Sequence, residues 1–259
     1  MRQFPAEFES FLSAKGRRLL AGRSDLAGAL ADPRRRVLAA DGLLDSRQVE
    51  GARLLLDRAL LPHISRIDRP IPPEATWEMG ENYGELLPKT MRVSTATFER
   101  KRGRAWQAAQ GVGLAAMLGS QSFRAFAEAI AGRALAKGWG MQALCYGPGD
   151  YAGPHNDHQP ENPKAKQGYI DIHLSLPNLD VAQQFLVYAQ TGHFTKIESV
   201  TKPGRITAYR LPLWHYTTPL VAKRGRESSA RRWVLLGTFL YADAPSPAGN
   251  RAVGSKVRG

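Results

Sequence analysis

A histidine and an aspartate two positions apart, His155 and Asp157, follow a stretch rich in glycine and proline. Alternate residues of a β-strand point to one face, so an imidazole and a carboxylate at this spacing can bind one metal ion from one side. His215, in a later strand-like segment, supplies a third ligand. Two histidines and one carboxylate form a facial set that suits Fe(II) and leaves coordination positions open. The pattern therefore predicts a catalytic metal site at His155, Asp157 and His215.

Other histidines compete for the metal, and a His-x-Asp pair alone is a weak signal because histidines commonly lie at surfaces. His158 would point to the opposite face of a continued strand, so we expect a loop residue near the site. His193 lies in a turn-like stretch, so we expect it at the surface. His63 follows Pro62 in a helical region, where we expect a structural role.

Alternating strand and turn patterns surround the three candidate ligands. Strand-like segments occur at 142–146, 168–177, 184–188, 205–215 and 232–241. This order resembles the double-stranded β-helix, or jelly-roll, of the Fe(II)- and 2-oxoglutarate-dependent dioxygenases, including prolyl hydroxylases and alkylated-nucleobase demethylases. The resemblance covers residues 142 to 241, and it implies an α+β fold with a jelly-roll core buttressed by N-terminal helices.

The same resemblance implies roles for single residues. The family's first two metal ligands correspond to His155 and Asp157, and its distal histidine corresponds to His215. A tyrosine shortly before the first ligand often lines the cosubstrate pocket in that family, and Tyr146 stands there. A basic residue at the start of the final strand binds the distal carboxylate of 2-oxoglutarate, and Arg232 matches it by position.

The choice of arginine stays open at the level of sequence. The interval from His215 to Arg232 is longer than in the prolyl hydroxylases, which leaves Arg231 and Arg226 as candidates. A cosubstrate-binding arginine must point inward with every second residue of its strand. Both faces of the segment 232–241 are apolar, however, so strand parity does not choose. Arginine suits the role because its planar guanidinium can form two parallel hydrogen bonds to a carboxylate.

The segment Tyr169 to Leu176 has one polar and one aliphatic face. Tyr169, Asp171, His173 and Ser175 alternate with aliphatic residues. In an antiparallel sheet such a polar face is usually solvated. The alternative follows from the resemblance, in which this strand lines the cosubstrate pocket. Ser175 and His173 would then line the cavity, with Asp171 nearer its mouth.

The resemblance implies three reactants at the metal site: Fe(II), 2-oxoglutarate as cosubstrate, and dioxygen. The expected reaction is hydroxylation of a protein side chain or a small metabolite, or demethylation through hydroxylation. The first alternative is the same chemistry directed at nucleic acid, which would need a basic rim and an aromatic platform. The second is a non-enzymatic jelly-roll that binds or senses metal.

The amino-acid composition limits which binding partners and which cellular compartment we expect. The 259 residues carry a net charge of +13, which favours a polyanionic partner, but the basic residues are scattered and no nucleic-acid-binding motif is present. Cys145 is the only cysteine, which excludes an intramolecular disulfide and favours a reducing, cytoplasmic location. No signal peptide is apparent, and no apolar run approaches transmembrane length, so we expect no membrane partner.

Three regions follow from these patterns. Residues 1–140 are expected to be mainly helical, with amphipathic helices near 45–60 and 122–136, and to pack on the core. Their long loop, 69–84, is expected to be a surface connection, with a cover over the active-site mouth as the alternative. Residues 141–242 form the predicted catalytic core. Residues 243–259 have few apolar side chains that could be buried, so we expect a flexible tail.

Overall fold

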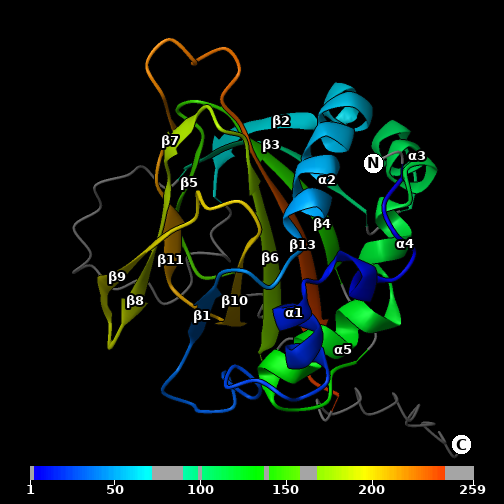
Figure 1. Cartoon of the computed structure of the whole chain (residues 1–259). Coiled ribbons are helices and arrows are strands. Elements are labelled where there is room, and N and C mark those ends of the chain that lie inside the picture. Colours follow the sequence, from blue (N-terminus) through cyan, green and yellow to red (C-terminus); the bar gives the residue numbers. More distant parts are fainter. Residues whose placement is uncertain (1–2, 72–89, 99–100, 137–139, 158–167, 243–259) are drawn as a thin grey trace, which may run out of the picture.

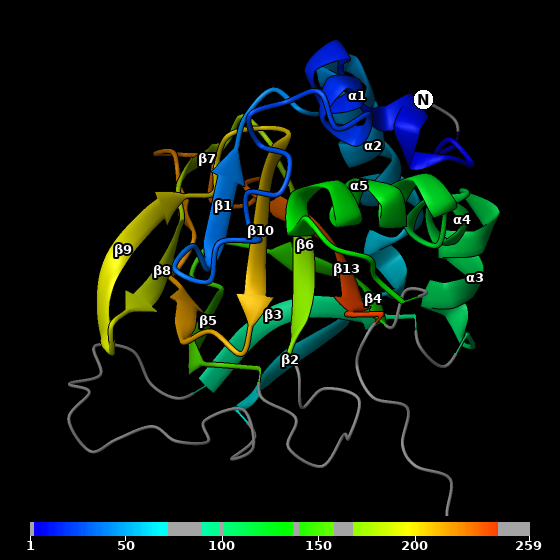
Figure 2. The same cartoon turned by 90° about the horizontal axis from the view of Figure 1, so that it is seen from below.

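A computed structural model describes residues 3–71, 90–98, 101–136, 140–157 and 168–242. Within these ranges, eleven antiparallel strands form one sheet in the order β1-β10-β6-β13-β4-β3-β5-β11-β8-β9, with β2 paired to β3. Figures 1 and 2 show that this sheet curls into a nearly closed barrel, with the helices gathered on one side of it. The arrangement is α+β.

The strands have the following bounds: β1 Val37–Ala40, β2 Ser65–Pro70, β3 Thr90–Thr97, β4 Gly140–Tyr146, β5 Tyr151–His155, β6 Tyr169–Pro177, β7 Val181–Gln183, β8 Phe185–Gln190, β9 His193–Ser199, β10 Arg205–Leu211, β11 His215–Thr217, β12 Val221–Ala222 and β13 Arg232–Leu240. The helices are η1 Phe8–Phe11, α1 Ala14–Leu20, α2 Ser46–Ala59, η2 Leu61–His63, α3 Arg104–Gly111, α4 Leu114–Leu118 and α5 Gln121–Ala131. Strands β7 and β12 form a separate small sheet.

Three strands of the main sheet come from the region that the sequence predicts to be mainly helical. Strand β1 pairs with β10, and β2 pairs with β3. Strand β3 pairs with both β4 and β5, so it joins two parts of the barrel. The sheet therefore begins well before residue 141. Of the predicted loop 69–84, only the first residues are described, and the predicted tail at 243–259 lies outside the described residues.

Helix α2 follows the sequence prediction closely. Asp45 caps its first turn by accepting hydrogen bonds from the backbone N–H groups of Arg47 and Gln48. Helix α5 ends earlier than predicted. The prediction ran to Ala136, whereas the helix stops at Ala131 because Gly132 adopts a left-handed φ of 70°.

The main hydrophobic core lies between the helices and the outer face of the sheet. Phe123 and Phe126 of α5 are fully buried there, opposite Trp233 and Phe239 of β13. The aliphatic face of β6 packs into the same core. Figure 2 shows α5 lying across β6 and β13. The other face of these strands is thereby turned towards the interior of the barrel.

Candidate metal centre

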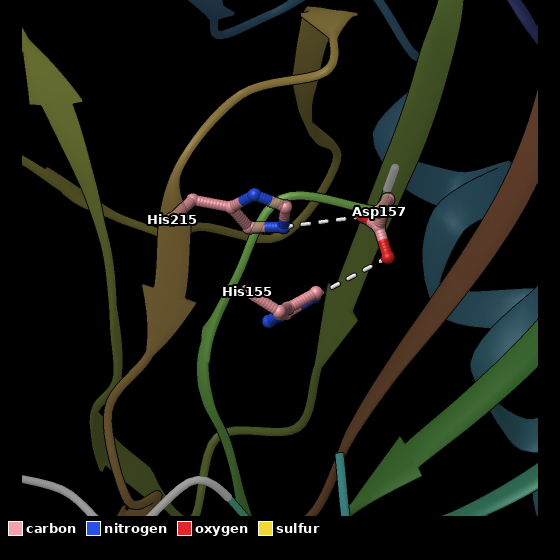
Figure 3. Close-up of side chains that lie close together, drawn as sticks. All are labelled: His155, Asp157 and His215. Carbon is pink, nitrogen blue, oxygen red and sulfur yellow. Dashed lines mark ion pairs between the residues drawn. The ribbon is translucent and has the colours of Figure 1, made fainter. Parts of the chain in front are cut away.

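The three predicted ligands come together at one point of the barrel interior. His155 ends β5, His215 begins β11, and the two residues are cross-strand partners. His155 Nε2 lies 3.5 Å from one carboxylate oxygen of Asp157, and His215 Nε2 lies 3.6 Å from the other. The three ligand atoms lie within 4.8 Å of one another. Figure 3 shows both imidazole rings pointing towards the carboxylate.

Asp157 reaches this point in a different way from the one its spacing predicts. Strand β5 ends at His155, so the alternation of a continuous strand does not align the two side chains. Instead, Asp157 adopts a φ of 54°, a left-handed conformation that is uncommon for residues other than glycine. Its backbone carbonyl accepts a hydrogen bond from the Tyr169 hydroxyl. A strained backbone held by a neighbouring strand is typical of a functional position.

The protonation of the histidines fits a metal ligand set. Each Nδ1 donates to a backbone carbonyl oxygen, His155 to Gly153 at 2.6 Å and His215 to Leu213 at 2.7 Å. Burial, together with the nearby His155, lowers the pKa of His215 to about 3, so its Nε2 carries a lone pair at neutral pH. This lone pair faces a carboxylate oxygen, and two acceptors at that distance need a cation between them. The donor set therefore fits a divalent transition metal.

A cavity of about 490 Å³ opens beside the three ligands. Its wall includes the polar face of β6, which is turned towards this cavity and not towards the outer surface of the sheet. Alternate residues of β13, the strand paired with β6, line the adjoining part of the wall, beginning with Arg232. The parity that the apolar sequence of β13 left open is set by the helices, which cover Trp233 and its face.

Arg232 is a buried cation at one end of this cavity. Its Nε donates to the side-chain oxygen of Gln184 at 2.6 Å, and one terminal nitrogen donates to Ser175 Oγ at 3.2 Å. The guanidinium lies 4.8 Å from the centre of the Tyr146 ring. Burial lowers its pKa to about 10, so it remains charged at neutral pH. Among the described residues no carboxylate forms an ion pair with it.

The two competing arginines lie outside the cavity. Arg226 is exposed and lies near Asp180. Arg231 lies near Asp57, and its Nε donates to the carbonyl of Ser229. Neither lines the cavity, whereas Arg232 does. The geometry thus separates three candidates that the sequence could not.

Gln184 is a contributor that the sequence analysis missed. It is fully buried, and its side-chain nitrogen donates to the backbone carbonyls of Asp150 and Thr218. These bonds fix the amide so that its oxygen faces Arg232 Nε. No sequence motif marks this glutamine, because only the folded chain brings the residue between β7 and β8 next to Arg232, the first residue of β13.

The remaining histidines differ in whether they line the cavity or lie at the surface. His173 lines the cavity, and its Nε2 is hydrogen-bonded to the Tyr209 hydroxyl at 2.8 Å. His193 is exposed at the start of β9, which confirms the predicted surface position. His63 is exposed at the end of η2. His158 lies outside the described residues.

Two further expectations concern the reactivity of Cys145 and the presence of membrane-spanning helices. Cys145 is a buried residue of β4, as its apolar neighbours predict, and burial raises the pKa of its thiol to about 12. Such a thiol is not a nucleophile at neutral pH. Among the described residues, no helix combines the length and apolar character needed to cross a membrane.

Comparison with protein-family models gives no match, and comparison with curated proteins gives none either. Solved structures, in contrast, are similar over most of the chain. An oxidoreductase of the 2OG-Fe(II) oxygenase family from Burkholderia pseudomallei is 12% identical with a TM-score of 0.56, covering 85% of this chain and 90% of its own.

Two further similar structures come from nogalamycin biosynthesis. The non-heme alpha ketoglutarate dependent carbocyclase SnoK is 13% identical with a TM-score of 0.56, covering 90% of this chain and 89% of its own. The epimerase SnoN, in complex with Fe3+, alpha ketoglutarate and nogalamycin RO, is 15% identical with a TM-score of 0.50, covering 88% of this chain and 84% of its own. The predicted jelly-roll is confirmed, and the chain has the fold of the 2OG-Fe(II) oxygenases.

Proposed function

We propose that this protein is a 2-oxoglutarate-dependent non-haem Fe(II) dioxygenase. One observation carries the proposal: a two-histidine, one-carboxylate cluster lines the same cavity as a buried guanidinium that has no acidic partner among the described residues. The first would hold Fe(II), and the second would bind a dicarboxylic cosubstrate. The similarity to SnoN, which was solved with Fe3+ and alpha ketoglutarate, supports the same assignment.

Fe(II) with bound 2-oxoglutarate would supply oxidative decarboxylation by dioxygen to succinate and carbon dioxide, coupled to hydroxylation of a substrate C–H bond. The chain's own residues bind and orient the reactants. His155, Asp157 and His215 would hold the metal on one side and leave its other positions to the cosubstrate and to dioxygen. None of these side chains needs to act as a general base.

Arg232 would bind the distal carboxylate of 2-oxoglutarate. Its Nε and one terminal nitrogen are already bonded to Gln184 and Ser175, which fixes the plane of the guanidinium. The second terminal nitrogen has no hydrogen-bond partner among the described residues, so it remains to donate to a carboxylate. Ser175 Oγ donates to the carbonyl of Val200 at 2.5 Å and therefore accepts from Arg232, which keeps it as a support for that group. Tyr146 would line the same end of the cavity.

The proposed prime substrate is a protein side chain or a small metabolite, hydroxylated or demethylated through hydroxylation. Arg232 is the only lysine or arginine among the described residues that line the cavity, and it lies at the cosubstrate end. This gives the nucleic-acid alternative no basic rim within the described wall. A non-enzymatic metal-binding jelly-roll would have no use for a buried, unpaired guanidinium. The single buried cysteine also supports the proposed reducing, cytoplasmic location.

The first test is an anaerobic titration. Metal-free protein is given Fe(II) and then 2-oxoglutarate, and the visible metal-to-ligand charge-transfer band is recorded. The proposal expects a saturable band that is lost in His155→Ala and needs far more 2-oxoglutarate in Arg232→Ala. Arg226→Ala, which removes an exposed arginine, serves as the matched control and should titrate like the parent.

Admission of dioxygen extends the same test. Succinate should form in the parent and remain undetectable in His215→Ala. A folded, iron-loaded protein that gives no band and no succinate would leave the non-enzymatic metal-binding function in its place.

A further inference from the structure

Asp171 is a buried carboxyl group on the cavity wall that the proposed mechanism does not use. Its side chain is 7% exposed, and it lines the cavity. Its Oδ1 has no hydrogen-bond partner among the described residues, and Oδ2 lies 3.7 Å from His173 Nε2. Buried polar atoms are almost always hydrogen-bonded, and an unmade bond is costly. Asp171 therefore gives the cavity wall a carboxyl group with hydrogen-bonding capacity left for a ligand.

The position of Asp171 in the sheet places it beside the metal centre and away from Arg232. Asp171 is the cross-strand partner of Tyr209, whose ring centre lies 5.0 Å from that of His215. Ser175, which contacts Arg232, lies four residues further along the same face of β6. At about 3.3 Å per residue, roughly 13 Å of strand separate the two positions. The cavity thus has a cation at one end, a carboxyl group towards the other, and the metal ligands alongside.

His173 does not complete the hydrogen bonding of Asp171. Its Nε2, the nitrogen nearer to Asp171, is hydrogen-bonded to the Tyr209 hydroxyl at 2.8 Å. Its ring also lies against the ring of Tyr209, with centres 4.8 Å apart. These contacts hold His173 beside Asp171, and Thr238, the cross-strand partner of Asp171 on β13, lies on the other side of the carboxyl group. Among the described residues, Oδ1 is still without a hydrogen-bond partner.

The charges of the loaded site point to the kind of donor that is missing. Arg232 would neutralise one carboxylate of 2-oxoglutarate, and Fe(II) would neutralise the other carboxylate together with Asp157. Asp171 is then the one acidic group left without a counter-charge among the described residues that line the cavity. Burial raises the pKa of this carboxyl, and a cation bound beside it would lower the pKa again.

We propose that Asp171 binds a protonated amine of the prime substrate, which makes organic amines the substrate class of this cavity. This inference rests on the proposed dioxygenase function. The amine would lie at the end of the cavity away from Arg232, and the carbon chain attached to it would pass the metal centre. Asp171 is in this role a specificity-determining residue rather than a metal ligand.

The test measures binding without turnover. The full-length protein is loaded with Zn(II) in place of iron and with 2-oxoglutarate, and ligand-observed NMR follows titrations of n-butylamine and n-butanol, which have similar size and differ in charge. The parent should prefer the amine, and Asp171→Asn should lose about ten- to a hundredfold of amine affinity because a charge-assisted bond is removed. Butanol binding should change little. N-acetyl-lysine N-methylamide, titrated in parallel, distinguishes a lysyl side chain from a free amine as the source of the ammonium group.

Matched variants keep the result interpretable. Asp171→Asn keeps the size of the side chain, and Asp171→Glu keeps the charge and should retain part of the amine preference. Asp68→Asn, which removes a surface carboxylate paired with Arg92, controls for net charge and should bind like the parent. Thermal unfolding confirms that each variant is folded.

Each outcome separates this inference from the proposed function. Normal 2-oxoglutarate binding with equal affinity for amine and alcohol, or with unchanged amine affinity in Asp171→Asn, overturns the inference and leaves the dioxygenase assignment intact. Amine binding that depends on Asp171 in a protein that binds no 2-oxoglutarate supports the amine site and removes the dioxygenase function.

Discussion

At the scale of single residues, Arg232 combines a cost in stability with a proposed role in binding, because its hydrogen-bond partners among the described residues are the neutral Gln184 and Ser175. A buried charge without a counter-charge destabilises a fold, and functional sites commonly accept such a cost. The sequence favoured Arg232 by its position but left Arg231 and Arg226 as alternatives, because parity in an apolar strand marks neither face as internal. The cluster of His155, Asp157 and His215 was predictable from residue type, although Asp157 joins it through a left-handed backbone and not through strand alternation. Gln184 and the unpartnered oxygen of Asp171 had no motif.

Arg232→Met should separate the two properties. We expect 2-oxoglutarate affinity to fall by at least about a hundredfold, because two charge-assisted bonds are lost. The metal-free variant should unfold at a higher temperature than the parent, since a methionine of similar length replaces a buried, unpaired charge. Calorimetric titration of the metal-loaded protein and thermal unfolding of the metal-free protein measure the two effects. A lower unfolding temperature would show that the parent already neutralises this charge.

Gln184→Glu should weaken cosubstrate binding by giving Arg232 an internal carboxylate partner. The new carboxylate would lie where the amide oxygen now accepts from Arg232 Nε at 2.6 Å, and it would pair with the guanidinium. We expect at least roughly tenfold weaker 2-oxoglutarate binding, because the cosubstrate must compete with an internal anion. The charge-transfer titration checks this, with metal affinity expected to stay unchanged. Undiminished 2-oxoglutarate affinity would place the carboxylate elsewhere.

At the scale of elements, the two faces of β6 illustrate what periodicity can and cannot determine. Alternation predicted a strand with one polar and one aliphatic face, and both were found. Which face is internal depends on α5, which lies over the aliphatic face. That placement depends on contacts between distant segments, which a local pattern does not contain. The end of α5 was mispredicted for a local reason, because Gly132 and Gly138 are equivalent signals until one adopts a left-handed φ.

Gly237→Ala should loosen the contact between α5 and β13. A methyl group at this position would overlap the ring of Phe123, which is fully buried between Phe8 and Phe239 and has no room to move. We expect a loss of about 1–3 kcal/mol in the free energy of unfolding. Gly111→Ala is the control, because that position has open space around it and should be neutral or gain up to about 1 kcal/mol. Denaturant unfolding of both variants measures the difference, and equal stabilities would contradict the proposed close packing.

At the scale of the whole molecule, the candidate metal site connects elements that are far apart in the chain. His155 and His215 belong to two paired strands, β5 and β11, and Asp157 lies just beyond β5. A ligand that binds only the folded state stabilises it in proportion to the logarithm of its excess over the dissociation constant. Metal binding and global stability are therefore coupled.

Addition of a divalent metal should raise the unfolding temperature, and chelation should reverse the change. At a hundredfold excess over the dissociation constant, the expected gain is about 2.7 kcal/mol. The gain should disappear in His215→Ala and persist in His193→Ala, because His193 is exposed on β9 and is not a member of the cluster. Differential scanning calorimetry makes the measurement. A stabilisation that survives in His215→Ala would indicate a metal bound somewhere else.

The pairing of β1 with β10 also determines when the barrel can form during synthesis. Residues 37–40 emerge from the ribosome early, but their partners at 206–209 are made near the end. Strand β3 likewise waits for β4 and β5. Pairings so distant in sequence impose a large loss of chain entropy before they stabilise anything, and such topologies fold slowly. Strand β1 must therefore stay without its partner until translation is almost complete, and an unpaired apolar strand of this kind exposes the nascent chain to aggregation.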